Sequence, residues 1–282
     1  MLRLDMVHKS YGSVPALKGV SLHCEPGEVF ALLGPNGAGK STTIGIATGV
    51  LRPDSGSVKL VGIGSPQESS TRAHIGVATQ SIALYDELNA TENLRFFGRL
   101  YGLPRETIRQ RSADLLERVG LDSRAADPVH SYSGGMKRRL NLAVALIHDP
   151  KLVLLDEPTA GVDPQSRNAI LDLVTQIGDE GRTVIYSTHY MEEAQRVSDR
   201  VAILDHGSVI VTGTVDELIA SHGGQTRVRR DSPTGQEATQ TDEPLQTLAT
   251  MLALPDTLAI HVDRPDLEAV FFNLTGRSLR DP

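Results

Sequence analysis

Short apolar runs recur along the chain, and most of them do not alternate with polar residues. Five such runs, set between stretches of helical periodicity, read VFALLG, HIGVATQ, LVLLDEP, TVIYSTH and RVAILDHG. A strand that is apolar on both sides is buried on both faces. The pattern therefore predicts an α/β fold in which helices cover a mostly parallel sheet.

The first 28 residues follow a different pattern. Apolar and polar positions alternate there in two runs, with turns expected at Gly12 and at Pro26-Gly27. Alternation is typical of antiparallel strands that turn one face to a core. Cys24, the single cysteine, falls on the apolar face of the second run, which predicts a small buried side chain rather than a reactive thiol.

Two regions depart from the α/β pattern. Between Leu88 and Leu121 the apolar stripes are wholly helical, so we expect a helical insertion over about residues 88–148 of a main domain that spans 1–222. The second region, 223–282, begins with a polar stretch rich in Gly, Thr and Gln, which predicts a flexible linker. A strand in TLAIHVDRP and a short helix in PDLEAVFFNLTG then indicate a small accessory module.

Composition narrows the class of protein. The chain has 282 residues, 39% of them hydrophobic, and a formal net charge of −7. No apolar run approaches the roughly 18 residues that a membrane span needs, and the first residues lack the regions of a signal peptide, so we expect a protein of the cytosol. The negative charge argues against a nucleic-acid partner. The basic clusters Lys137–Arg139 and Arg227–Arg230 are interpreted as solvated faces.

A glycine-rich loop follows the run VFALLG. Its spacing, from Gly34 to Ser41, is GxxxxGK[ST]. In such a loop the backbone N–H groups surround the α and β phosphates of a nucleotide, a lysine reaches the β and γ phosphates, and a hydroxyl coordinates Mg²⁺. The alternative is a flexible turn with a solvated lysine. The residues expected at the phosphates are Gly34, Pro35, Asn36, Gly37, Ala38, Gly39, Lys40, Ser41 and Thr42.

Two carboxylates follow the strand expected at LVLL. The carboxyl ends of such strands are where open α/β sheets bind ligands. Asp156 is placed to hold Mg²⁺, and Glu157 to orient and polarise the attacking water. A pair of exposed acids before Pro158 is the alternative.

His189 and Gln80 also lie at the ends of expected strands. We expect His189 to hydrogen-bond the γ-phosphate and the water, whereas a structural histidine is the alternative. Gln80 is a candidate to touch Mg²⁺ or water through its amide oxygen. Chemistry alone does not separate that role from an ordinary strand end.

A second helix start lies at Ser133, Gly134 and Gly135. Free N–H groups and a hydroxyl at a helix N-terminus suit an anion, although an ordinary helix cap explains the same residues. A second anion site without its own lysine makes sense if it meets the γ-phosphate held by another copy of the chain.

Together these motifs resemble the ATP-binding subunit of an ABC transporter, over nearly all of Leu2 to Ile219. The resemblance implies that Gly34–Thr42 is the Walker A loop, and that Asp156 and Glu157 are the Walker B aspartate and the catalytic glutamate. It implies further roles for residues elsewhere: Tyr11 stacks on adenine, Gln80 is the Q-loop, Ser133–Gly135 the signature, Asp163 the D-loop and His189 the switch histidine. A turn tyrosine is the alternative for Tyr11.

The resemblance also implies partners. ABC cassettes bind two ATP molecules between two copies, and no catalytic position is degenerate here, so we expect an ATP-bridged homodimer. Permease subunits in the membrane would hold it at the cytoplasmic face, and aromatic residues of the helical insertion are expected near them. The sequence YSGGM, in place of the usual LSGGQ, and the ending RPDLEAVFFNLTGRSL resemble daunorubicin-type drug exporters. A single-cassette ATPase that serves assembly rather than transport is the alternative.

Overall fold

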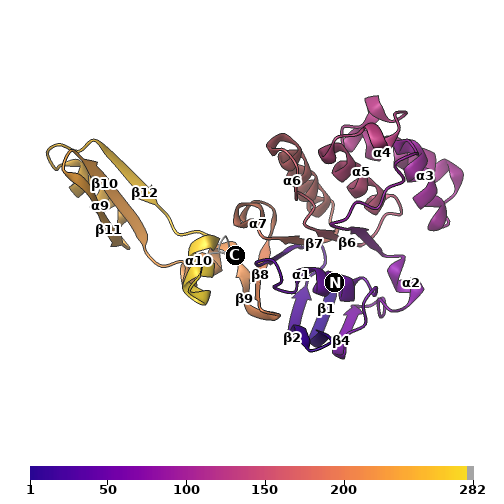
Figure 1. The fold of residues 1–282 in the computed structure, drawn as a ribbon, viewed down its shortest axis with the longest axis horizontal. Coiled ribbons are helices and arrows are strands. Elements are labelled where there is room, and N and C mark those ends of the chain that lie inside the picture. The colour runs from indigo at the N-terminus through magenta and orange to yellow at the C-terminus, as the bar shows by residue number, and fades with distance from the viewer. Residues whose placement is uncertain (278–282) are drawn as a thin grey trace. The chain divides into compact units, whose positions relative to one another are not determined.

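The computed structural model describes residues 1–277, and the chain forms two compact units, Met1–Thr212 and Gly213–Pro282. Figure 1 shows the elements of both units along the chain. The end of the main domain at residue 222 remains a prediction. None of the helices in the described residues has the length and apolar character needed to cross a bilayer.

A six-stranded sheet forms the centre of the first unit, and the mostly parallel sheet predicted from the apolar runs is confirmed. In spatial order its strands are β5 (Ile75–Ala78), β6 (Leu152–Asp156), β7 (Thr183–Thr188), β3 (Val29–Leu33), β8 (Arg200–Asp205) and β9 (Ser208–Thr214). The pairs from β5 to β8 are parallel. β9 follows β8 after the turn His206-Gly207, where φ is 46° and 80°, and positive values at both positions suit a two-residue hairpin.

The order of the strands decides where the motifs meet. β5, β6, β7 and β3 are neighbours, so their carboxyl ends share one edge of the sheet. Leu33 is in register with Thr188, and Asp156 with Ser187. The glycine-rich loop, the two carboxylates, His189 and Gln80 all leave the sheet at this edge.

A second sheet is antiparallel and confirms the alternating pattern of the first residues. It pairs β2 (Val14–Cys24), β1 (Leu2–Tyr11) and β4 (Ser55–Leu60) in that order. Its apolar face packs with α1 (Lys40–Ala47) and with Phe30, Leu32, Leu152 and Leu154 on one side of the central sheet. Cys24 is buried in this layer, and burial raises the pKa of its thiol well above the ordinary value, as expected for an inert side chain.

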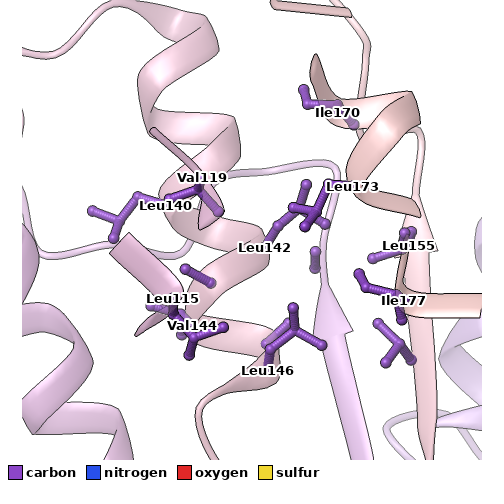
Figure 2. Packing of buried hydrophobic residues seen from close by; sticks show 14 of the residues in the cluster. Leu115, Val119, Leu140, Leu142, Val144, Leu146, Leu155, Ile170, Leu173 and Ile177 are labelled. Carbon is purple, nitrogen blue, oxygen red and sulfur yellow. The ribbon is translucent and has the colours of Figure 1, made fainter. Parts of the chain in front are cut away.

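Helices cover the other side of the central sheet. The insertion between β5 and β6 contains α3 (Ala90–Leu100), α4 (Arg105–Arg118), two 3₁₀ turns (Asp122–Arg124 and Val129–Ser131) and α5 (Gly134–Leu146). The remaining helices of this unit are α2 (Ser69–Arg72), α6 (Pro164–Asp179) and α7 (Met191–Val197). Side chains of α4, α5 and α6 pack with those of β6 in one buried cluster (Figure 2). The helical insertion predicted from the stripes is therefore present.

The second unit differs from the expected linker. Residues 223–243 do not form a loop, because β10 (Thr226–Ser232) and β11 (Gly235–Thr241) make a hairpin, and β10 pairs on its other edge with β12 (Ala259–Asp263). Val228 is fully buried, and the Arg230 guanidinium donates to Thr257 Oγ1 at 2.8 Å and to the Pro255 carbonyl oxygen. These partners lie far along the chain, so the local composition did not reveal them.

Three helices complete the second unit: α8 (Val215–His222), α9 (Pro244–Leu252) and α10 (Leu267–Thr275). The predicted strand and short helix of the tail are confirmed as β12 and α10. Asp266 caps α10 by accepting from Ala269 N, and Gly276 ends it in the left-handed region. The last letters of the tail motif, Ser278 and Leu279, lie outside the described residues.

The interpretation of the basic clusters as solvated faces is wrong for three of their members. Lys137 pairs with Asp86 at 2.9 Å, and Arg139 donates to the Val119 carbonyl oxygen. Arg230 of the second cluster is buried. These cations therefore stabilise the fold from within the chain.

Candidate nucleotide-binding and catalytic site

The glycine-rich loop leaves β3 and enters α1 at the shared edge of the sheet. Gly39 precedes the helix with φ of 106°, and a Cβ there would come within 2.9 Å of the Ala16 carbonyl oxygen, so only glycine suits this position. A cavity of 630 Å³ lies above the loop. The residues that line it are Ala16, Asn36, Gly37, Gly39, Lys40, Ser41, Thr42, Gln80, Glu157, Ala160 and His189.

This cavity is the candidate site because of the residues that line it, and not because of its size. A larger hollow of 780 Å³ lies between α3 and α4, and none of the motif residues lines it. Tyr11 and Ser133, which the sequence assigned to nucleotide contacts, are outside the set that lines the smaller cavity. Most of the loop residues expected at the phosphates line the cavity, and those that do not are Gly34, Pro35 and Ala38. The expected adenine and partner contacts lie apart from this set.

Lys40 is buried at the bottom of the cavity, with an exposed fraction of 4%. Its ammonium donates to the carbonyl oxygens of Gly34 at 2.8 Å and of Pro35 at 3.1 Å. It also lies 3.2 Å from Oε1 of Glu157. A buried charge needs such partners, because an isolated one carries a desolvation penalty of several kcal/mol.

Glu157 is the centre of the site. Its backbone has φ of 46°, in the left-handed region. Residues other than glycine are strained there by about 1–2 kcal/mol. The Glu157 N–H donates to the Ser187 hydroxyl at 3.0 Å and is held in this conformation. Strain of this kind is found where the surrounding structure fixes a reactive side chain.

Two further predicted residues meet the same carboxylate. Gln80 Nε2 donates to Oε2 of Glu157 at 3.2 Å, and His189 Nδ1 lies 3.2 Å from Oε1. The carboxylate therefore has a cation, an amide and an imidazole around it. The strands β5, β6, β7 and β3 each contribute one member of this group, as the shared edge requires.

Asp156 lies beside Glu157 and contacts the start of α1. Its Oδ1 accepts from the Ser187 hydroxyl at 2.6 Å and from the Ser41 hydroxyl at 3.3 Å. A hydroxyl and a carboxylate oxygen so close to each other are ligands that Mg²⁺ accepts, with phosphate and water oxygens completing the shell.

The start of α5 is built differently. The Ser133 hydroxyl accepts from Met136 N at 3.2 Å, so it caps the helix, and both Ser133 and Gly134 are exposed. Gly135 is buried, and a Cβ on it would lie 2.1 Å from the Ser166 hydroxyl of α6. Asp163 caps α6 by accepting from Ser166 N at 2.9 Å, and these hydrogen bonds lower the pKa of its carboxyl.

Arg138 is a site residue that sequence reasoning missed. It was grouped with a basic cluster, yet its guanidinium donates to the Gln80 carbonyl oxygen, to Thr79 O at 3.4 Å and to Ala160 O at 3.4 Å. Burial lowers the pKa of Arg138. Through Arg138, helix α5, which Ser133 caps, is hydrogen-bonded to backbone carbonyl groups of residues 79, 80 and 160.

Tyr11 lies at the end of β1 with half of its surface exposed, and its ring centroid is 5.9 Å from Lys9 Nζ. An exposed ring at a strand end is available for stacking. Its contact with adenine remains a prediction.

Comparison with known proteins decides the family. A family model described as ABC transporter matches residues 17–160, about half of the chain. The chain belongs to the ABC transporter family. As an ABC ATPase it binds ATP and hydrolyses it for transport.

Curated relatives extend the likeness of this ABC ATPase to the whole chain. It is 41% identical to the linearmycin resistance ATP-binding protein LnrL of Bacillus subtilis (strain 168), with all of both chains covered. It is 36% identical to the daunorubicin/doxorubicin resistance ATP-binding protein DrrA of Streptomyces peucetius, over 97% of this chain and 92% of that one. The Nod factor export ATP-binding protein I of Ralstonia nicotianae is also 36% identical, over 100% and 95%.

Solved structures agree with the fold. An ATP-binding subunit of an ABC transporter superimposes with a TM-score of 0.72 at 30% identity, covering 79% of this chain and 93% of that chain. A dimeric, post-hydrolysis ATP-binding cassette bound to ADP and Pi gives 0.69 at 29% identity, covering 76% and 98%. The predicted ABC-type P-loop fold is confirmed.

Proposed function

We propose that this ABC ATPase powers an exporter of amphipathic compounds such as drugs, antibiotics or lipid-like molecules. The observation that carries the proposal is the convergence of Lys40, Gln80 and His189 on the Glu157 carboxylate at the cavity. In this group the Lys40 ammonium can bind phosphate, and the Glu157 carboxylate can accept a proton from water. The resistance and export names of the relatives support the direction and the class of cargo.

The geometry supports a sequence of events at the γ-phosphate. Lys40 and Glu157 neutralise each other at 3.2 Å, and an entering phosphate competes with the carboxylate for the ammonium. Once Lys40 turns to the phosphate, Oε1 of Glu157 is free to accept a proton from the attacking water. His189, 3.2 Å from the same oxygen, is placed to hold the γ-phosphate and the water in line.

Mg²⁺ is proposed as the second cofactor. Ser41 and Asp156 would hold it, because the Ser41 hydroxyl lies 3.3 Å from Oδ1 of Asp156. Gln80 lines the same cavity as Ser41, and we propose its amide oxygen as a further contact. The ion supplies neutralisation of the charge on the phosphate oxygens. We propose that the remaining residues of the loop Gly34–Thr42 and the ring of Tyr11 contribute to ATP binding and not to the hydrolysis step.

We propose that hydrolysis requires two copies of the chain. Ser133 and Gly134 are exposed at the helix start and Gly135 is buried behind them, and the N–H groups of this turn meet the γ-phosphate held by the other copy. Asp163 lies next to this helix start and belongs to the same interface. The dimeric cassette among the solved structures supports this arrangement.

The partners in the membrane are proposed to be permease subunits, which would hold the ATPase at the cytoplasmic face. Tyr85, with 48% of its surface exposed, contacts Phe96 edge-to-face at 4.6 Å and gives the helical insertion an aromatic patch for such a contact. An ATPase for assembly is the alternative function, and a permease encoded beside this chain would decide against it.

The test is reconstitution. The chain is co-purified with the membrane protein encoded beside it, placed in liposomes, and assayed for ATP hydrolysis with linearmycins, daunorubicin-type drugs and Nod factors, the compounds that appear in the relatives' names. We expect one of these classes to stimulate hydrolysis several-fold and to be transported. Hydrolysis that is independent of the membrane protein and of every compound favours the assembly function.

A further inference from the structure

A buried carboxylate outside the motifs lies behind the catalytic site. Glu193, in α7, has only 2% of its surface exposed. Its Oε1 accepts from the Thr159 hydroxyl at 2.8 Å, and its Oε2 accepts from the hydroxyls of Tyr186 at 2.8 Å and of Thr188 at 2.7 Å. Arg167 Nε of α6 lies 3.5 Å from Oε1. A carboxylate has about four acceptor positions, and the three hydroxyls use three of them.

The partners of Glu193 all come from segments that carry reacting groups. Thr159 follows Glu157 by two residues, and Thr188 directly precedes His189. The Thr188 hydroxyl also accepts from Tyr190 N at 2.9 Å, which fixes the backbone on the far side of His189. Arg167 lies one helical turn after Asp163, the predicted partner-facing residue. One carboxylate thus lies against three segments of the site: the turn after β6, the end of β7 and the first turn of α6.

We infer that Glu193 is a positioning residue, which sets the distance between the Glu157 carboxylate and the His189 imidazole for hydrolysis. The inference rests on the roles proposed above for Glu157 and His189. Glu193 contacts neither the cavity nor the glycine-rich loop, so it acts through Thr159 and Thr188.

The charges around Glu193 favour a fixed arrangement. Burial, and after it the Glu193 carboxylate, raise the pKa of Tyr186 well above the ordinary value, so that hydroxyl stays a donor. Thr159 and Thr188 donate from fully buried positions, with exposed fractions of 1% each. Because hydrogen bonds to a buried carboxylate are strong and directional, a change of length or charge at position 193 shifts both loops.

The test compares Glu193→Gln with Glu192→Gln in the full chain co-purified with its membrane partner. Glu192 is the adjacent residue of the same helix and is exposed, so its variant is the matched control. We expect Glu193→Gln to lower kcat at least tenfold while KM and the dissociation constant for ATP change less than threefold, because the phosphate loop is untouched. The control keeps the kcat of the unmodified chain.

A second pair of variants tests the inference if Glu193→Gln does not fold. Thr159→Val removes one donor without a change in size, and Thr159→Ser keeps the hydroxyl. We expect a three- to tenfold loss of kcat for valine and a smaller loss for serine. A control-like kcat in Glu193→Gln, or in Thr159→Val if the first variant does not fold, overturns the inference. So does a parallel loss of ATP affinity and kcat, which indicates general unfolding.

Glu157→Gln, measured in the same preparation, separates this inference from the proposed function. If Glu157→Gln still turns over, the proposed site is wrong and the inference falls with it. If Glu157→Gln is inactive and Glu193→Gln turns over normally, only the role of Glu193 is wrong.

Discussion

Two helices of this ABC ATPase begin at glycines, and their surroundings differ. The start of α1 lies at a cavity with Lys40 buried beneath it and with Glu157, Gln80 and His189 around it. The start of α5 is exposed, and within the described residues the Ser133 hydroxyl has one hydrogen bond, from Met136 N. The start of α1 has a cation and a carboxylate beside it, whereas the start of α5 has N–H groups and the Ser133 hydroxyl. The difference fits our proposal that the start of α5 binds a nucleotide held by another chain.

The largest effect on ATP turnover is expected from a substitution at the start of α1. Glu157→Gln keeps the size of the side chain and removes the base, so turnover should fall about 10³-fold, within the range known for general bases. ATP binding should persist, because Lys40 and the loop remain. Phosphate release and calorimetry measure the two quantities, and size-exclusion chromatography with ATP should show a trapped dimer. Hydrolysis close to that of the unmodified chain would contradict the role of Glu157.

The next effect is expected at the α5 end. Ser133→Arg places a bulky side chain where a second copy is proposed to bind, and hydrolysis should fall about 10²-fold, as when electrostatic stabilisation of a transition state is removed. ATP binding to the single chain should not change. Ser131→Arg, at an exposed position in the preceding 3₁₀ turn, is the control. Equal loss in both variants argues against a shared site.

The attachment of α5 to the sheet is expected to depend on pH. His148 lies just beyond α5, stacks on Tyr101 with ring centroids 3.6 Å apart, and its Nε2 lies 3.0 Å from Ile75 O. Burial lowers the pKa of His148 to about 4. The unfolded chain therefore takes up a proton near pH 6.5 that the folded chain does not, and stability falls as the pH drops from about 6.5 toward 4.

From pH 7 to pH 5 this histidine should decrease the free energy of unfolding by about 2 kcal/mol. Urea unfolding at the two pH values measures the decrease. His148→Gln removes the titrating ring and should show a decrease smaller by about that amount. An equal decrease in both proteins would mean that other groups cause it.

The smallest effect is expected at the predicted adenine contact. Tyr11→Ala should weaken ATP binding about fivefold, near the lower limit for a base stacked on an aromatic ring, because half of the ring is exposed. Tyr11→Phe keeps the ring and should bind like the unmodified chain. Titration with a fluorescent ATP analogue gives both constants. Unchanged affinity in Tyr11→Ala would leave the tyrosine as a turn residue.

The sequence predicted which residues gather at the start of α1, because each of its short motifs directly follows an apolar strand. Lys40, Asp156, Glu157 and His189 were found in this way, and the sheet order then explains why they meet. That order is set by pairing between distant strands, which no local pattern contains. Arg138 and Glu193 were missed for the same reason, since each looks like a charged residue on a helix surface until its distant partners are known.

The second unit shows the same limit. The stretch from 223 to 243 is polar enough to resemble a linker, yet β10 has a partner strand on each edge, and one of them, β12, begins 27 residues after β10 ends. Backbone hydrogen bonds on both sides compensate for the few apolar side chains. The amino-acid composition of a segment does not predict such pairing with distant strands.

The contact of Gly135 with Ser166 limits how the ATPase can move. A Cβ at Gly135 would lie 2.1 Å from the Ser166 hydroxyl and 3.4 Å from Oδ2 of Asp163, so the starts of α5 and α6 approach each other too closely for any side chain at position 135. If the proposed dimer forms, we expect Ser133 and Asp163 to reach the second subunit together, because the helix starts that carry them lie against each other at Gly135.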